Sequence, residues 1–338
     1  MTLVNIKSSI SLREYNSFKI DVIAKYFIRI ETVEQLQSLS KNPIFIENKR
    51  YFLWAWSNTF FTKDFDGIIV HIDIQWINII KETNNSTTLR VWAGQNWDEF
   101  VNLCTYNRHL YGIENLVSIP GQVWACPVQN IWAYGVEAKD TIESVEYLDM
   151  NTWHIQTLTN KQCEFWYRDS VFKQSLYGIA CITHVSFTLC KKDAYTVNNQ
   201  YGAITQETDS TDPKDICSAI KKIRASKLPD RHKIGAAWRF FKNPLIDEEQ
   251  FLWLQKKYPD IVGHPHHNHI KVSAWRLIEQ TVGKNYRIWD AATYEKHALV
   301  LVNLGNTSPQ DMLMLIEHIQ TQVEQTFWVH LEPEVNIL

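Results

Sequence analysis

The stretch Ile119–Tyr134, IPGQVWACPVQNIWAY, closed by Gly135, decides the fold. Proline anchors two turns in it, at Pro120-Gly121 and at Cys126-Pro127, and Gln129-Asn130 places side-chain amides before an Ala-Tyr-Gly bend. Proline fixes φ and glycine frees it, so such a loop can bring backbone N–H groups close to a ligand. Most single Pro-Gly pairs are surface turns, but this density of turns favours a loop that wraps the phosphates of a cofactor.

Composition indicates a globular chain of two or three domains, since 45% of its 338 residues are hydrophobic and 21% are charged. The net charge is −3 and the basic residues are spread out, so no nucleic-acid partner is expected. No apolar run reaches the roughly 20 residues that cross a bilayer, and the N-terminus lacks the apolar core of a signal peptide. We therefore expect a cytoplasmic protein without a membrane partner.

The cysteines indicate neither a zinc site nor a disulfide framework, because they stand far apart without a C-x-x-C pair. We expect them to fill the core as small apolar side chains. They are Cys104, Cys126, Cys163, Cys181, Cys190 and Cys217.

Further motifs lie on both sides of the central loop. Ser57 and Asn58 end the run LWAWSN after an expected strand, and Tyr167–Lys173 reads YRDSVFK. Gly235–Pro244 reads GAAWRFFKNP, and Leu331–Val335 reads LEPEV. On physical grounds alone, Ser-Asn after a strand is more often a turn than a phosphate cradle.

Together these motifs resemble those of the UDP-N-acetylenolpyruvoylglucosamine reductases, bacterial enzymes of cell-wall precursor synthesis. The central loop resembles their flavin-binding signature, I-P-G-x-V-G-A-x-P-x-Q-N-I-G-A-Y-G, with Trp124 and Trp132 at two of its glycines. The run Leu53–Asn58 resembles L-G-x-G-S-N, and Gly235–Pro244 resembles G-N-A-G-S-F-F-K-N-P. The YRDS and LEPE runs match without change, so the resemblance covers nearly the whole chain.

The resemblance implies an α+β fold of two flavin-binding lobes and a C-terminal substrate-binding lobe. The expected boundaries are residues 1–72 together with the C-terminal strand 326–338, residues 73–228, and residues 229–325. It also implies the cofactors FAD and NADPH and a UDP-sugar substrate. We expect a monomer that reduces UDP-N-acetylglucosamine enolpyruvate to UDP-N-acetylmuramate for peptidoglycan synthesis, and so serves cell shape and cell division.

The resemblance assigns three catalytic positions. Arg168 would stabilise the negative charge that forms on the reduced enolpyruvyl group, and Glu334 would be a partner acid near the same carbon. Arg239 stands where the family has the serine that delivers a proton. Because a guanidinium keeps its proton near neutral pH, Arg239 cannot act as that general acid.

Binding residues follow from the same motifs. In the subclass with a mobile tyrosine over the substrate, that tyrosine corresponds to Tyr201. The substrate-binding set is Tyr201, Arg224, Lys227 and Asn243. The cofactor-binding set is Ser57, Asn58, Pro120, Gly121, Pro127, Gln129, Asn130, Tyr134 and Gly135. Taken without the resemblance, Arg224 and Lys227 on a helix face would usually be solvated charges.

Glycine is scarce and tryptophan abundant. Average usage of ~7% would give about 24 glycines in this length, whereas the chain has 11, beside 14 tryptophans. Eleven tryptophans stand at turns or where the family pattern has, or would accept, glycine: Trp54, Trp56, Trp76, Trp92, Trp124, Trp132, Trp153, Trp166, Trp238, Trp275 and Trp289. This pattern predicts weak or absent flavin binding by the chain that carries these tryptophans.

Two other functional readings stay open. One is a non-catalytic or impaired relative that keeps the fold, and the other is a flavin oxidase of the wider superfamily. No His or Cys motif for covalent flavin attachment stands near Trp54, which disfavours the oxidase. His264–His269, HPHHNH, could hold a divalent metal, but a solvated loop is favoured because no carboxylate or cysteine completes a tetrahedral set.

Local patterns predict helices over residues 32–40 from a Thr N-cap, over 98–107 from apolar spacing, and over 211–230 from an Asp start and a Pro stop. Helices are also expected over 247–257 and 308–325. Strands are expected over 179–190 and 195–205.

Overall fold

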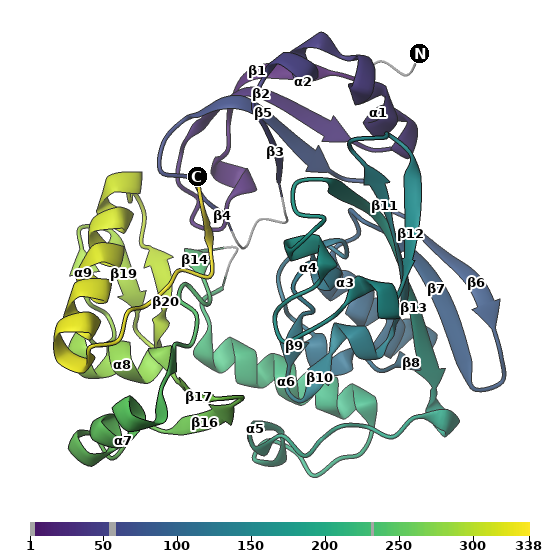
Figure 1. The fold of residues 1–338 in the computed structure, drawn as a ribbon. Helices are drawn as coiled ribbons and strands as arrows, with labels where there is room; N and C mark the ends of the chain where they lie inside the picture. Colours follow the sequence, from purple (N-terminus) through teal and green to yellow (C-terminus); the bar gives the residue numbers. More distant parts are fainter. Residues whose placement is uncertain (1–3, 54–58, 231–232) are drawn as a thin grey trace. The chain divides into compact units, whose positions relative to one another are not determined.

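The computed structural model describes residues 4–53, 59–230 and 233–338 (Figure 1). Helices and sheets are mixed along the chain, so the predicted α+β class is confirmed. The predictions for Trp54, Trp56, Ser57 and Asn58 lie outside the described residues. The chain forms two compact units, which are described separately: Met1–Ser9, Lys25–Ala55 and Asp66–Ser226 make the first, and Ile10–Ala24, Trp56–Phe65 and Lys227–Leu338 make the second. The division into three lobes stays a prediction.

The first unit is built on two main sheets. The larger has the order β12-β11-β13-β7-β6, with β8 beside β13. Its strands are β6 (Ile77–Glu82), β7 (Ser86–Trp92), β8 (Leu110–Tyr111), β11 (Ile142–Asp149), β12 (Ile155–Thr159) and β13 (Ala180–Lys191). The smaller has the order β1-β2-β5-β3, where β3 and β5 run parallel. Its strands are β1 (Ile6–Ser11), β2 (Ile23–Ile30), β3 (Arg50–Leu53) and β5 (Phe65–Ile72). A short pair, β9 (Trp132–Ala133) and β10 (Val136–Glu137), ends the central loop.

Strand β13 organises the large sheet because its first eight residues are all buried. Such a strand, covered on both faces, is expected to be an almost continuous apolar run, and ACITHVSF fits. Figure 1 shows α3 (Trp97–Asn102) on one face of this sheet, and its Phe100 ring lies 5.2 Å from the Phe187 ring of β13. The other helices of this unit are α1 (Val33–Ser38), α2 (Pro43–Glu47), α4 (Ala125–Val128), α5 (Gly202–Thr205) and α6 (Pro213–Lys227), whose last residue belongs to the second unit.

The second unit holds a sheet of order β14-β20-β19-β18 and a smaller one of order β15-β17-β16. The strands are β4 (Thr59–Phe60), β14 (Gly235–Ala237), β15 (Leu245–Ile246), β16 (Gly263–His266), β17 (His269–Val272), β18 (Arg287–Ile288), β19 (Ala291–Tyr294), β20 (His297–Asn303) and β21 (Asn336–Ile337). The helices are α7 (Glu248–Lys257), α8 (Ala274–Thr281) and α9 (Pro309–Phe327). Strand β21 pairs in parallel with β4.

The predicted helices are present, and side-chain caps explain where several begin. Thr32 accepts a hydrogen bond from the Gln35 amide at α1, and Asp247 accepts one from Gln250 at α7. Ser308 and Asp311 form a reciprocal capping box at α9. Such caps can be predicted from a sequence because the donor and the acceptor lie only three residues apart.

Two local predictions were wrong. The segment 195–205 is not a strand: it is irregular up to Tyr201 and then forms the short helix α5. The histidine-rich segment is a β-hairpin, not a loop, because His264–His266 pair with His269–Lys271.

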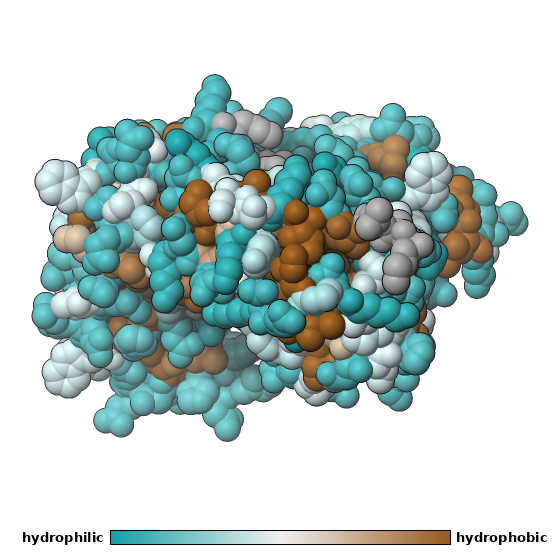
Figure 2. All heavy atoms as spheres, turned by 90° about the horizontal axis from the view of Figure 1, so that it is seen from above, coloured by the Kyte–Doolittle hydropathy of each residue, from teal (hydrophilic) through white to brown (hydrophobic). Residues whose placement is uncertain are grey.

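The cysteines lie where their expected role in the core would place them. Five of the six cysteines are buried and none is disulfide-bonded, which confirms their role as core filler. The helices of the described ranges include none that is long and apolar enough to span a bilayer. Figure 2 shows a face dominated by hydrophilic side chains, with hydrophobic atoms in smaller patches.

A buried histidine makes stability depend on pH. His184 on β13 lies opposite Trp92, and its Nδ1 atom is 3.5 Å from the Glu146 carboxylate. Arg90 donates two hydrogen bonds to that carboxylate, each 2.6 Å long. Burial, assisted by Arg90 and opposed by Glu146, lowers the pKa of His184 from 6.5 to about 4. His184 is therefore neutral in the folded protein at pH values where it would be protonated in the unfolded chain.

We expect the free energy of unfolding to fall as pH drops from about 6.5 to about 4, by up to roughly 3 kcal/mol from His184. The unfolded chain takes up a proton in this window and the folded chain does not, so stability rises with pH here. Urea unfolding at several pH values, for the unaltered chain and for His184→Gln, measures the effect. The variant should show a shallower slope, and equal slopes would contradict this assignment.

Candidate functional site

The central loop of the first unit folds onto itself and onto residues 93–95. The Val123 amide donates to the Gln95 carbonyl (2.9 Å), the Trp124 amide to Ala93 (3.1 Å), and the Ile131 amide to Cys126 (3.1 Å). Gly121 has a φ of 129° and its carbonyl accepts from the Trp97 amide, so this turn needs glycine. Many backbone donors of the loop are thus engaged within the protein.

The amide side chain of Asn130 is also engaged by the protein. Its Nδ2 atom donates to Glu137 (2.5 Å) and to the Trp166 carbonyl (3.1 Å), and its Oδ1 atom accepts from the Lys139 amide (3.0 Å). Of the other residues predicted to bind the cofactor, Pro127 is buried, Pro120, Gln129 and Tyr134 are half-buried, and Gly135 is exposed. Asn130 therefore shapes the loop, while Pro120, Gln129, Tyr134 and Gly135 keep some exposed surface.

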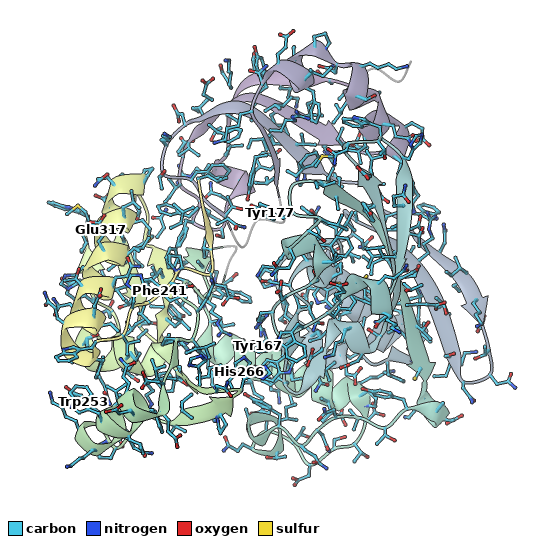
Figure 3. All side chains as sticks on the ribbon, viewed as in Figure 1. Tyr167, Tyr177, Phe241, Trp253, His266 and Glu317 are labelled. Atoms are coloured by element: carbon cyan, nitrogen blue, oxygen red, sulfur yellow. The ribbon has the colours of Figure 1, made fainter. Side chains whose placement is uncertain are left out.

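The YRDS run forms a tight turn that presents Arg168. Trp166 and Asp169 pair across the turn, and Arg168 has a left-handed φ of 56°. The Ser170 hydroxyl donates to the Val128 carbonyl (2.6 Å) and so fixes the turn to α4. The Arg168 Nη2 atom donates to the Trp132 carbonyl (3.4 Å) at the end of the central loop. Figure 3 labels the neighbouring Tyr167.

Tyr201 and Arg224 lie near the same end of the loop. The Tyr201 ring meets the Tyr134 ring edge-on at 5.4 Å and the Trp132 ring at 6.3 Å. Arg224 is hydrogen-bonded to Tyr134; its pKa is lowered chiefly by burial and partly by the charge of Arg168. Two guanidinium groups and two tyrosines thus gather in the first unit, an arrangement suited to an anionic ligand.

Side-chain contacts hold the segment that carries Tyr201. The Tyr195 hydroxyl donates to the buried Glu114 carboxyl group (2.6 Å), and Asn115 donates to the Asn198 carbonyl (2.8 Å). Burial raises the pKa of Glu114, while the hydrogen bond from Tyr195 opposes that rise. The Asn198 side chain in turn donates to the Gly135 carbonyl (2.9 Å). This segment is therefore anchored to the central loop without sheet pairing.

In the second unit, Arg239 and Glu334 form an ion pair, with 2.9 Å between Arg239 Nε and Glu334 Oε2. Backbone pairing brings their two motifs together, because Phe241 bridges to Pro333 and the Glu334 amide donates to the Phe240 carbonyl (2.7 Å). Figure 3 labels Phe241. Two of the predicted catalytic positions are thus direct partners, which the sequence did not predict.

Another residue near this pair was not predicted. His297 begins β20, its Nδ1 atom accepts from the Leu299 amide (3.3 Å), and its ring lies 5.8 Å from the Trp275 ring. Burial lowers the pKa of His297, and the positive charges of Lys227 and Arg239 add to this effect. The only signal in the sequence is a histidine at the start of an apolar strand.

The other two residues predicted to bind the substrate, Lys227 and Asn243, lie in different parts of this unit. Lys227 is exposed at the end of α6. The Asn243 Oδ1 atom accepts from the Ala274 amide (3.1 Å) at the start of α8, so this side chain joins two motifs. Across residues 4–53, 59–230 and 233–338, no cluster of three or more His, Cys, Asp or Glu side chains could hold a metal ion.

With the side chains of this sequence, the central loop does not fit a dinucleotide. Many of its backbone donors and the Asn130 amide already bond within the protein. The Trp132 indole also lies beside Tyr201, among the residues that a ligand of this loop would contact. A pyrophosphate needs free N–H groups and close approach of the backbone, which glycine permits and an indole obstructs.

Comparisons with known proteins cover the whole chain. Residues 24–157 match the family model of an FAD binding domain, and residues 230–338 match that of the UDP-N-acetylenolpyruvoylglucosamine reductase C-terminal domain. The chain is 38% identical to the UDP-N-acetylenolpyruvoylglucosamine reductase of Flavobacterium johnsoniae, over 99% of this chain and 100% of the relative. It is 39% identical to that of Amoebophilus asiaticus, with the same coverage.

A solved structure has the same fold. The UDP-N-acetylenolpyruvylglucosamine reductase of Thermus caldophilus superposes with a TM-score of 0.68 over 99% of both chains, at 20% identity. The sequence identities and the two family models agree on one assignment: the chain belongs to the UDP-N-acetylenolpyruvoylglucosamine reductase family.

Proposed function

We propose that this protein reduces UDP-N-acetylglucosamine enolpyruvate to UDP-N-acetylmuramate with electrons from NADPH, in the synthesis of peptidoglycan precursors. FAD, when bound, supplies hydride transfer in this family. The observation that carries the proposal is the cluster in the first unit, where the intact YRDS turn places Arg168 near Arg224, Tyr134 and Tyr201.

The roles of the arginines follow from the charge of the substrate. Reduction of an enolpyruvyl double bond leaves negative charge shared between C2 and the carboxylate, and a fixed guanidinium such as Arg168 stabilises it. Arg224 and Lys227 would bind phosphate oxygens of the UDP group. Because Arg224 feels the positive charge of Arg168, an anion bound between them would relieve that repulsion.

Proton delivery to C2 is the step for which this chain lacks the usual group. Arg239 keeps its proton and instead neutralises Glu334 at 2.9 Å. Delivery would therefore depend on a protonated Glu334 or on a water molecule, and we expect slow turnover of the chain as written.

The proposal extends to the cellular role. Supply of this precursor would support cell shape and cell division, with the protein acting as a cytoplasmic monomer. Its remaining predicted site residues would act in binding: Pro120, Gly121, Pro127, Gln129, Asn130 and Gly135 toward FAD, and Tyr201 and Asn243 toward the substrate.

NADPH oxidation in the presence of the enolpyruvyl UDP-sugar tests the proposal. The assay compares the unaltered chain with one carrying Arg239→Ser and glycine at positions 54, 56, 124 and 132. Under the proposal, the altered chain consumes NADPH beyond one equivalent per bound flavin only when the UDP-sugar is present. If it binds FAD but shows no consumption that depends on the UDP-sugar, the non-catalytic reading is correct.

A further inference from the structure

Three tryptophans have a left-handed backbone conformation. The φ values of Trp153, Trp289 and Trp328 are 60°, 52° and 57°. Left-handed φ is uncommon for any residue with a side chain and is an outlier for a bulky one, whereas glycine adopts it freely. Ten other non-glycine residues of the described ranges also have positive φ, among them Arg168, so the surroundings of each tryptophan decide whether its position is one for glycine.

The hairpin between β18 and β19 shows this most clearly. Ile288 pairs with Ala291, so only Trp289 and Asp290 connect the two strands. Trp289 has the positive φ, at the first central position of the turn, while Asp290 is not among the positive-φ residues. A two-residue turn of this kind, type II′, has glycine at that first position.

Helix α9 ends at a second such position. Trp328 follows the last helical residue, has a left-handed conformation, and donates its amide to the Glu324 carbonyl (2.8 Å). Helices often end with a left-handed residue that closes the last turn in this way, and that residue is usually glycine. Tryptophan has no conformational reason to stand here.

The side chains agree with the backbone. Trp289, Trp328 and Trp76 are 79%, 78% and 65% exposed, although tryptophan is highly buried on average. Trp92 is half-buried, and its buried Nε1 atom has no hydrogen-bond partner among the described residues. Its ring also lies 3.9 Å from the His184 ring at a 54° tilt. Trp328 stacks on the Trp253 ring at 6.0 Å, but the three exposed indoles bury little surface, and the Trp92 ring crowds His184.

Trp97 differs from Trp289 and Trp328 in both backbone conformation and burial; Trp124 is as buried as Trp97, so its assignment rests on the motif of the central loop. Trp97 is 1% exposed, lies in the helical α3, and donates through Nε1 to the Leu116 carbonyl (2.9 Å). Its ring packs against Phe100 and Phe187 at 5.9 and 5.8 Å. This side chain has the burial, packing and hydrogen bond of a true core tryptophan.

We propose that the working protein carries glycine at the tryptophans that occupy glycine positions, and that a single codon accounts for all of them. UGA is a stop codon in the standard code, but variant codes read it as tryptophan or as glycine. In a cell that reads UGA as glycine, the gene encodes glycine at its UGA codons. If the same gene is translated with UGA read as tryptophan, the chain has tryptophan at those positions and keeps its UGG-encoded tryptophans. The glycine positions are the eleven found from the sequence, together with Trp328.

This substitution also accounts for the composition and for the misfit of the central loop. The shortfall of about 13 glycines is close to the number of such tryptophans, and the chain has 14 tryptophans in all. Glycine at 124 and 132 would remove both indoles from the loop and restore freedom of its backbone to approach a ligand. The inference rests on conformation, burial, composition and the family motifs, and none of these depends on reductase activity, so it is tested separately from the proposed function.

The gene and the natural protein test it directly. The codons for Trp153, Trp289 and Trp328 should all be UGA, whereas that for Trp97 should be UGG. Mass spectrometry of peptides from the protein made by its own cells should find glycine at the first three positions and tryptophan at position 97. UGG at the three positions, or tryptophan in their peptides, would overturn the proposal.

Unfolding temperature gives a second test that needs no activity. Trp289→Gly and Trp328→Gly should each raise the unfolding temperature by roughly 2–4 °C, because glycine adopts the left-handed conformation without strain. The matched control Trp97→Gly should lower it. A fall in all three variants would contradict the assignment, while a stable glycine form without reductase activity would refute only the proposed function.

Discussion

Arg239→Ser is expected to raise turnover about 10²–10⁴-fold, in a chain that also carries glycine at the cofactor-loop tryptophans. The serine hydroxyl can hand a proton to the substrate carbon, whereas the guanidinium keeps its proton at neutral pH. The substitution also frees Glu334 from an ion pair of 2.9 Å. Steady-state NADPH oxidation at saturating UDP-sugar measures the effect on kcat.

Arg239→Ala is the matched control, because it breaks the same ion pair without supplying a hydroxyl group. We expect the alanine chain to stay far below the serine chain. Equal rates for the two would assign the gain to the release of Glu334, and no gain in either would remove position 239 from proton delivery.

In the chain that carries Arg239→Ser and glycine at the cofactor-loop tryptophans, Arg168→Gln is expected to lower kcat by about 10²–10³-fold, the usual loss when one donor to a developing negative charge is removed. Glutamine can still donate to the Trp132 carbonyl, which Arg168 contacts at 3.4 Å, so the turn should keep its shape. KM and FAD content should change much less than kcat. The measurement is a comparison of kcat, KM and flavin absorbance for the purified variant.

Lys191→Gln serves as the control for charge alone, since Lys191 pairs with Glu82 on the surface of the same unit. It should leave kcat unchanged. If Arg168→Gln lost bound FAD along with activity, Arg168 would belong to cofactor binding and not to charge stabilisation.

The fold could be predicted from the sequence because the motifs that indicate it are local and occur along the whole chain. Motifs along the whole chain named the family, and the capping residue Thr32 marked a helix start. The segment 195–205 was predicted wrongly as a strand because its fold depends on contacts with distant residues. Its partners are side chains, Glu114 for Tyr195 and Gly135 for Asn198, and such contacts leave no periodic trace.

The site was less predictable for the same physical reason. Sequence motifs identified Arg239 and Glu334 singly, but their ion pair depends on the bridge between Phe241 and Pro333, which are far apart in the chain. His297 approaches Arg239 because β20 pairs with β14, another long-range contact. The left-handed φ of Trp289 and Trp328 likewise appears only in three dimensions.

Reduction and reoxidation of a bound flavin tests the central claim most directly. The chain with glycine at its glycine-position tryptophans is mixed anaerobically with FAD and then with NADPH, and the flavin absorbance is followed. We predict that NADPH bleaches the band and that the enolpyruvyl UDP-sugar restores it. A chain that binds no FAD, or a flavin that stays reduced after the UDP-sugar is added, would contradict the account.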